Sequence, residues 1–144
     1  MLTRTDVHQA LSFDVLHSIF LGVWGKHLWP LIIKALGARG QSELDFRAVR
    51  VPGFPGLTIF TKNIGSTTFS DGNTFFSILQ QIVPLIHDLL DAYYQPLLKL
   101  VRVLADITLH ARFKMSTMSR IEAGESLVRE YGVLLPVSQA CSHL

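Results

Sequence analysis

Two long apolar stretches, each interrupted by charges, constrain this chain more than any other feature of its sequence. The first runs from Val15 to Leu36 and contains Lys26 and Lys34, and the second runs from Ile78 to Leu109 and contains five charged residues. A membrane-spanning helix needs about 20 mainly apolar residues, and a charge at its centre costs about 2.5–3.5 kcal/mol. Both stretches therefore predict helices that pack against other helices, and no membrane partner is expected.

The composition is typical of a single globular domain. The chain has 144 residues, of which 49% are apolar and 17% are charged, and soluble chains usually have roughly 25% charged residues. This apolar content excludes disorder as the main state. The net charge of +2 gives no ground for a nucleic-acid partner, and the single cysteine, Cys141, excludes an internal disulfide. The N-terminus lacks the apolar core of a signal peptide.

Apolar residues recur every four positions through the first stretch, which is typical of an amphipathic helix. Asp14 stands at its start, where the helix dipole favours a carboxylate. Pro30 predicts a bend or a break, and Gly37 with Gly40 predicts the end of the helix. A short helical turn is expected over residues 43–51.

Residues 52–73 are rich in Gly, Pro, Ser, Thr and Asn. Such a composition predicts a structured loop, and short β-branched runs at 57–61 and 67–69 allow a small hairpin within it. The turn at its end leads into a helix, with Asn73 or Asp71 as the N-cap.

Helical periodicity then continues almost to the end of the chain. It predicts one helix that begins at Thr74 and bends at Pro84, a second over residues 96–113, and a third over residues 116–136. The apolar stripe of the third helix consists of Ile121, Val128, Tyr131 and Leu135. The sequence thus predicts a mostly α fold, a helical bundle with one irregular Gly- and Pro-rich loop.

Asp14 and His17 are the first candidates for chemistry, because they stand three residues apart at the start of the first helix. Asp14 suits an N-cap, whose side chain accepts a hydrogen bond from an unpaired backbone N–H. The same position also suits a metal ligand, with the neighbouring imidazole to orient the carboxylate or its substrate. Both interpretations stay open on the residues alone.

Other histidines are weaker candidates. His87 and Asp91 stand one helical turn apart, beside Asp88, a spacing that suits either a zinc pair or an exposed ion pair. A structural zinc site needs four ligands, which favours the exposed pair. His27 and His110 lie on apolar stripes and are expected to be core or boundary residues.

Four basic residues gather around the predicted loop: Arg39, Arg47, Arg50 and Lys62. They suit a phosphate-facing surface or an ordinary solvated face equally well. The sequence contains neither a phosphate-binding loop motif nor a serine nucleophile elbow.

Three segments resemble successive blocks of one known family. Residues 10–32, ALSFDVLHSIFLGVWGKHLWPLI, resemble a block in which a D-x-x-H motif leads into a helix reading roughly G-[VL]-W-x-x-H-L-[WF]. Residues 54–86 are similar to the block that follows it, where Phe-Pro and Gly-Leu lead to a Phe-Ser-Asp-Gly turn and a long helix. Residues 101–136 resemble the helical tail of that block in their apolar spacing. The family is the Plavaka-type cut-and-paste transposases of fungi.

The resemblance implies an RNase H-like catalytic domain in which Asp, Asp and Glu hold Mg²⁺ or Mn²⁺ for DNA cleavage and joining. Asp14 matches the middle acid, and is thus implied to be a catalytic residue and a metal ligand. His17 matches the histidine of the D-x-x-H motif. DNA is the implied partner of the parent protein, and the nucleus is its implied location.

The same resemblance divides the chain, as a single fragment of that domain, into five parts. Residues 1–14 would end the catalytic strand region, and residues 15–37 would form the D-x-x-H helix. Residues 38–73 would be the irregular loop region, residues 74–136 the helical insertion, and residues 137–144 a frayed tail.

The chain departs from the family pattern in its acids. Thirteen residues precede Asp14, too few for the strands that carry the first acid, and the final acid would lie downstream of the last residue. None of Glu122, Glu125 and Glu130 is assigned that role. The chain alone is therefore expected to be inactive, to bind DNA weakly or not at all, and to hold no metal tightly.

Two alternatives remain beside this fragment hypothesis. One is a small all-α protein-interaction module without enzymatic activity, and the other is a membrane-associated helical protein, suggested by the positive mean hydropathy. The fragment hypothesis also predicts self-association, because the first-helix stripe would lack the sheet that covers it. That stripe consists of Leu16, Ile19, Phe20 and Val23.

Overall fold

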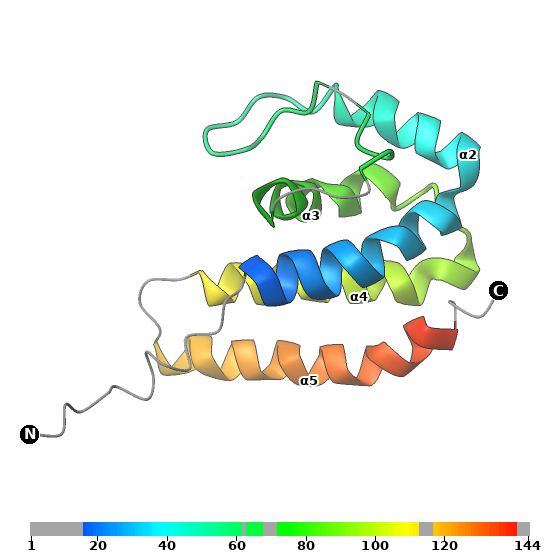
Figure 1. The fold of residues 1–144 in the computed structure, drawn as a ribbon. Coiled ribbons are helices and arrows are strands. Elements are labelled where there is room, and N and C mark those ends of the chain that lie inside the picture. The colour runs from blue at the N-terminus through cyan, green and yellow to red at the C-terminus, as the bar shows by residue number, and fades with distance from the viewer. Residues whose placement is uncertain (1–15, 62, 68–71, 113–116, 141–144) are drawn as a thin grey trace, which may run out of the picture.

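The computed structural model describes residues 16–61, 63–67, 72–112 and 117–140, and the side chains among them up to residue 136, beginning at Ser18. The elements are the π-helix η1 (Leu16–Leu28), α2 (Trp29–Ala48), α3 (Gly72–Ile86), the short 3₁₀ helix η2 (Ala92–Tyr94), α4 (Gln95–Ala111) and α5 (Met118–Ala140) (Figure 1). The described residues include no strand, so the predicted mostly α fold is confirmed. The small hairpin that the sequence allowed does not occur in the described part of residues 51–67.

The helical run that begins with η1 reverses direction at Gly37 (Figure 1). Gly37 has φ +60°, a conformation that residues with a Cβ rarely adopt. The predicted end of the first helix at Gly37 is confirmed by this break, and the helical turn predicted over residues 43–51 is confirmed for residues 43–48. The prediction that residues 38–73 form one irregular region was wrong for residues 38–48, because the helix resumes directly after Gly37. The second half of α2 buries Leu44, and its Gln41 amide donates to the Ile33 carbonyl in the first half at 3.0 Å.

The predicted break near Pro30 takes the form of a change in helix type. The π-helix η1 ends at Leu28 and α2 begins at Trp29, so Pro30 lies in the first turn of α2. Leu28 itself has helical backbone angles, φ −78° and ψ −39°, so the chain stays helical through this change.

One side of η1 and the first half of α2 is buried along its whole length. The buried residues recur every four positions: Phe20, Trp24, Leu28, Ile32 and Leu36. A spacing of four residues is slightly less than one turn of a π-helix, about 4.4 residues, and slightly more than one turn of an α-helix, about 3.6 residues. Residues with this spacing therefore shift one way around the axis of η1 and the opposite way around the axis of α2. The repeat therefore stays on the side that faces the core.

The prediction that the first-helix stripe lacks a partner was wrong for its described residues. Ile19 and Phe20 are buried, and Val23 packs against the core. Their partner is α3 of this same chain, where the Phe20 and Phe76 rings lie 4.6 Å apart. The helices approach so closely at Gly25 that a Cβ there would lie 3.0 Å from the Phe75 ring.

Helices α3 and α4 supply most of the remaining core. α3 begins at Gly72, so Asn73 lies inside the helix and its predicted N-cap role was wrong, while Asp71 lies outside the described residues. Pro84 stands inside α3, which ends two residues later. The predicted start of α4 is confirmed, because Pro96 lies in its first turn. Residues buried in α4 include Leu97, Leu98, Leu100, Val101, Val103 and Leu104.

Helix α5 lies along α4 at the lower edge of the molecule in Figure 1. It begins after Thr117, as predicted, and the Thr117 hydroxyl accepts a hydrogen bond from the Arg120 N–H at 3.4 Å. It continues through Pro136 to Ala140, so the predicted end at Pro136 was wrong. The predicted stripe is only partly covered, because the exposed fractions of Ile121 and Val128 are 43% and 58%.

Candidate functional site

The residues of the D-x-x-H motif stand at the edge of what the structure describes. Asp14 lies outside the described residues, and His17 lies in the first turn of η1 with a side chain that is not among those described. Their predicted roles as cap, catalytic pair or metal ligand therefore stay predictions. The described helix that follows them shows how this end of the chain is held.

Two tryptophans fix that helix to segments far along the sequence. Trp24 is fully buried, and its indole N–H donates to the Phe75 carbonyl at 2.9 Å. Trp29 donates to the Thr67 carbonyl at 2.8 Å, and the two indole rings lie 5.6 Å apart. Buried indole N–H groups need such partners, and each bond also joins two segments across the core. Sequence reasoning missed both anchors, although tryptophan at these positions belongs to the quoted G-[VL]-W-x-x-H-L-[WF] pattern.

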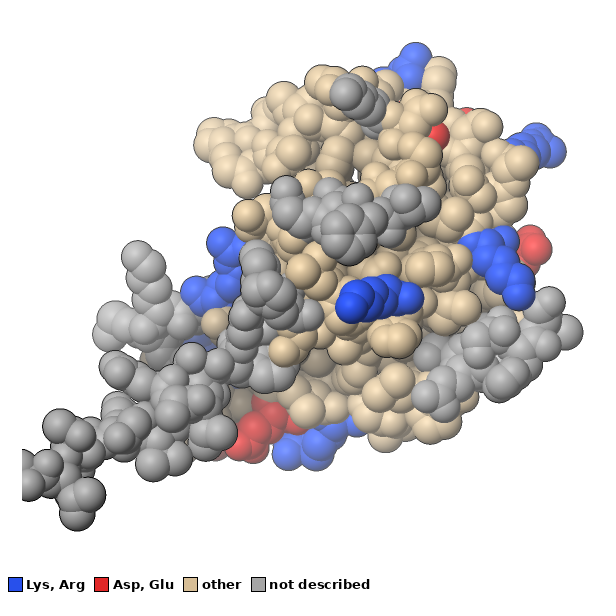
Figure 2. Space-filling model, viewed as in Figure 1, with Lys and Arg blue, Asp and Glu red and all other residues tan. Residues whose placement is uncertain are grey.

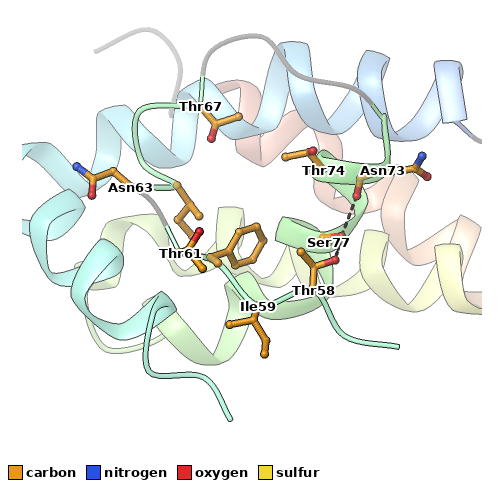
Figure 3. Close-up of a pocket in the computed structure, with 10 residues that line it drawn as sticks. Thr58, Ile59, Thr61, Asn63, Thr67, Asn73, Thr74 and Ser77 are labelled. Atoms are coloured by element: carbon orange, nitrogen blue, oxygen red, sulfur yellow. Dashed lines mark hydrogen bonds between the residues drawn. The ribbon is translucent and has the colours of Figure 1, made fainter. Parts of the chain in front are cut away.

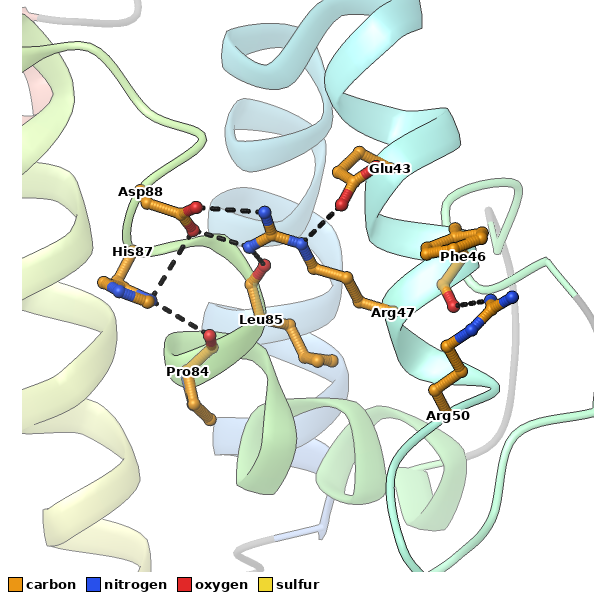
Figure 4. Close-up of polar contacts among 8 residues, drawn as sticks. All are labelled: Glu43, Phe46, Arg47, Arg50, Pro84, Leu85, His87 and Asp88. Carbon is orange, nitrogen blue, oxygen red and sulfur yellow. Dashed lines mark hydrogen bonds and ion pairs between the residues drawn. The ribbon is translucent and has the colours of Figure 1, made fainter.

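The last turn of α2 is joined to the end of α3 by one arginine (Figure 4). The Arg47 guanidinium donates to both carboxylate oxygens of Asp88, at 2.5 and 2.9 Å. It also donates to Glu43 at 2.8 Å and to the Leu85 carbonyl at 3.1 Å. The hydrogen bond from Arg47 lowers the pKa of Asp88 to about 2, and the bonds from Arg47 to Asp88 and Glu43 raise the pKa of Arg47.

The contacts of Arg47 and Arg50 bear on whether the basic residues near the loop form a phosphate-facing surface. The Arg47 guanidinium is paired with the carboxylates of Glu43 and Asp88. Arg50 donates to the Phe46 carbonyl at 2.7 Å, and its guanidinium lies 3.3 Å from the centre of the Phe46 ring. Arg39 is exposed beside them, and Lys62 lies outside the described residues. On the face drawn in Figure 2 the lysines and arginines are scattered over mostly uncharged surface. The cluster thus gives little support to a phosphate-facing surface.

The histidines that the sequence offered as candidates lie at the surface or at the boundary of the core. His87 is exposed, as predicted, but the carboxylate that lies near its imidazole, at 3.6 Å, is that of Asp88 and not that of the predicted partner Asp91 (Figure 4). Asp91 follows the end of α3 rather than standing one helical turn beyond His87. His110 is a half-buried boundary residue, as predicted, and its Nδ1 lies 2.9 Å from the Asp106 carbonyl oxygen. His27 is exposed, so its predicted place in the core or at its boundary was wrong.

An open hollow of about 350 Å³ lies between the loop and the start of α3 (Figure 3). Its polar lining consists of hydroxyl and amide groups from Thr58, Thr61, Asn63, Thr67, Asn73, Thr74 and Ser77. The Thr58 and Ser77 hydroxyls lie 2.9 Å apart, and Ser77 also donates to the Asn73 carbonyl. None of the lining residues is titratable, so these residues can hydrogen-bond a neutral group but supply no general acid or base.

The apolar first helical run is partly buried. Residues 18–48 form the one described stretch that is long and apolar enough to cross a bilayer, judged by length and composition. In the structure this stretch reverses at Gly37, and Trp24, Ile32 and Leu36 are buried against the rest of the chain. In the most apolar part of this stretch, 44% of the residues are buried inside the protein.

No known protein-family model, no curated protein and no solved structure matches this chain.

Proposed function

We propose that this chain is the helical part of a DNA transposase that resembles the Plavaka type, and that it holds the D-x-x-H helix in a fixed position. The observation that carries the proposal is the bonding between the two best-matching sequence blocks. Trp24 and Trp29 belong to the first block, and they bond to Phe75 and Thr67 of the second. Segments that resemble consecutive blocks of one family thus pack as one unit.

The physical role of this unit is preorganisation. A catalytic carboxylate must be held close to its productive position, and side chains on rigid elements are held better than side chains on loops. Asp14 comes two residues before η1, whose buried side is fixed by Phe20, Trp24 and Leu28. In the parent protein Asp14 would serve as the middle acid with His17 beside it, DNA would be the substrate, and the nucleus would be the location.

Mg²⁺ or Mn²⁺ is the cofactor that this proposal implies. In the described part of the chain no three His, Cys, Asp or Glu side chains come together as a metal site requires, and Asp14 lies outside that part. We therefore assign no step to a metal. The role proposed for the described residues is to position the helix that carries the motif.

The most direct test is to sequence the genomic DNA on both sides of the segment that encodes residues 1–144. The proposal expects an open reading frame with an upstream aspartate that follows a strand-like apolar run, a downstream glutamate, and inverted repeats around the gene. Stop codons or unrelated coding sequence on both sides, without such repeats, would contradict it.

A biochemical test uses the 144-residue chain itself. Because only one of the three acids has a match in it, at Asp14, the chain should not cleave DNA in Mg²⁺ or Mn²⁺. The matched variant is Asp14→Asn, which should behave like the parent chain. Metal-dependent cleavage that disappears in Asp14→Asn would overturn the proposal that this chain positions the motif without acting alone.

A further inference from the structure

We propose that α5 is a self-association surface, and that its partner is the α5 of a second copy of this chain, packed antiparallel about Val128. The inference is independent of the resemblance to transposases. It places self-association on a different helix from the one that the sequence predicted, because Ile19 and Phe20 of the first helix are already covered.

The surface is an apolar stripe beside the side of α5 that faces α4. Residues seven apart lie on one face of an α-helix, and Ile121, Val128 and Leu135 have this spacing. Ile121 and Val128 are exposed, and Leu135 is half-buried. The stripe spans 14 residues, or about 21 Å of helix. The side that packs on α4 is a different one, which carries Gly124, Leu127, Tyr131 and Leu134.

The stripe is self-complementary, which favours a second copy over an unrelated partner. In an antiparallel pair with a two-fold axis at Val128, Ile121 of one copy lies level with Leu135 of the other, and Val128 meets its own copy. Gly132 stands four residues beyond Val128, and a Cβ there would meet nothing within 4 Å. The missing side chain of Gly132 leaves room for a close approach of the two helices, and equal surfaces related by a two-fold axis define an isologous dimer.

The charges beside the stripe fit the same arrangement. Glu125 and Arg129 lie along one edge of it, both well exposed, and their charged atoms are 3.8 Å apart within one chain. In the antiparallel pair Arg129 comes within about two residues of the level of the other copy's Glu125, or about 3 Å along the helix. Each copy thus presents one cation and one anion to the opposite charges of its partner. A contact of this length is small, so the dimer should be weak and concentration-dependent.

Disulfide trapping gives the sharpest test of the geometry. In a Cys141→Ser background, Val128→Cys places one thiol on the proposed two-fold axis, where it meets its own copy. Val133→Cys is the matched control, because Val133 is 75% exposed on another side of the same helix. Mild oxidation should yield a covalent dimer at least tenfold faster for Val128→Cys. Equal rates for the two variants would overturn the proposal.

Sedimentation velocity then tests the association without cross-linking. The parent chain should show a sedimentation coefficient that rises with concentration, and Val128→Glu should remain monomeric, because it places two like charges together on the axis. Val133→Glu should sediment like the parent chain. Arg129→Glu should weaken the dimer several-fold, and adding Glu125→Arg should restore it. A monomeric parent chain at all concentrations, or a dimer that survives Val128→Glu, would refute the proposal.

Discussion

Helices α3 and α5 are both long and both carry apolar residues, yet they relate to the rest of the molecule very differently. Nine residues of α3 are buried, and the helix packs against η1, α2 and α4. Among the described side chains of α5, residues 118–136, none is buried, and this helix packs on α4. α3 therefore lies at the centre of the core, and α5 covers one side of it.

This difference shows that the burial of an apolar stripe depends on how many other helices pack around the helix that carries it. The polar contacts show the same contrast. Residues of α3 accept or share hydrogen bonds with the side chains of Trp24, Thr58 and Arg47. α5 is joined to α4 by the exposed ion pair of Lys99 and Glu130, whose charged atoms are 3.0 Å apart. Exposed ion pairs usually contribute little to stability. The free energy of unfolding should thus depend much more on side chains in the centre than on side chains in α5.

The largest expected effect comes from Trp24→Ala. This change removes a fully buried ring and leaves the Phe75 carbonyl without its donor, so the free energy of unfolding should fall by about 3–5 kcal/mol. Val133→Ala in α5 is the control and should change it by less than about 0.5 kcal/mol. Urea denaturation followed by circular dichroism measures both. Equal effects would show that the centre and the edge do not differ as described.

Two glycine substitutions of opposite sign sharpen the comparison. Gly25→Ala should destabilise the chain by about 1–3 kcal/mol, because its Cβ would lie 2.9 Å from the Phe20 carbonyl oxygen and 3.0 Å from the Phe75 ring. Gly132→Ala in α5 meets nothing within 4 Å and should stabilise the helix by up to about 1 kcal/mol. Thermal unfolding at a concentration where the chain is monomeric measures the two shifts. A stabilising Gly25→Ala would show that η1 and α3 are farther apart.

Tyr131→Phe tests the half-buried side of α5. Burial raises the pKa of the Tyr131 hydroxyl, and this hydroxyl has no hydrogen-bond partner among the described residues. Removing it should leave the free energy of unfolding unchanged or raise it by up to about 1 kcal/mol. The measurement is chemical denaturation of the two proteins side by side. A clear loss of stability would mean that the hydroxyl has a partner after all.

The smallest effect should come from the ion pair between Arg47 in the last turn of α2 and the exposed Asp88 after α3. The folded-state pKa of Asp88 is lowered to about 2, so its contribution to stability is present above about pH 4 and is lost as the pH falls towards 2. Asp88→Asn removes this contribution and should therefore flatten the acid side of the stability profile. Denaturation between pH 7 and pH 2 measures it. An identical profile for the variant would show that Asp88 does not titrate with folding.

The positions of most helices could be predicted from the sequence because helix starts depend on signals from local residues. Pro96 in the first turn of α4 and Thr117 before α5 are such signals, and both predictions are confirmed. Only a short turn was predicted after Gly37, over residues 43–51, and the helical residues 38–42 were missed because Gly40 resembles part of a helix end. The burial of Leu44, which sustains this helix, depends on distant segments. The contact between Arg47 and Asp88 joins residues 41 apart and leaves no local pattern.

The candidate site could be predicted only as a motif. Asp14 and His17 stand out by spacing and by resemblance, and their roles stay predictions because their side chains lie outside those described. What holds the helix behind them was not predicted, because the partners of Trp24 and Trp29 are backbone carbonyls 51 and 38 residues away. Carbonyl groups occur at every residue, so the sequence contains no sign of which one an indole will meet.

Hydrogen exchange followed by mass spectrometry tests the contrast between centre and edge most directly. At a concentration where the chain is monomeric, peptides from η1, α3 and α4 should exchange slowest and together, because their amides open only when the core unfolds. Peptides from α5 should exchange faster, in a separate event, because this helix can leave α4 without opening the core. Exchange of η1 ahead of α5, or equal protection of α5 and α3, would contradict the account.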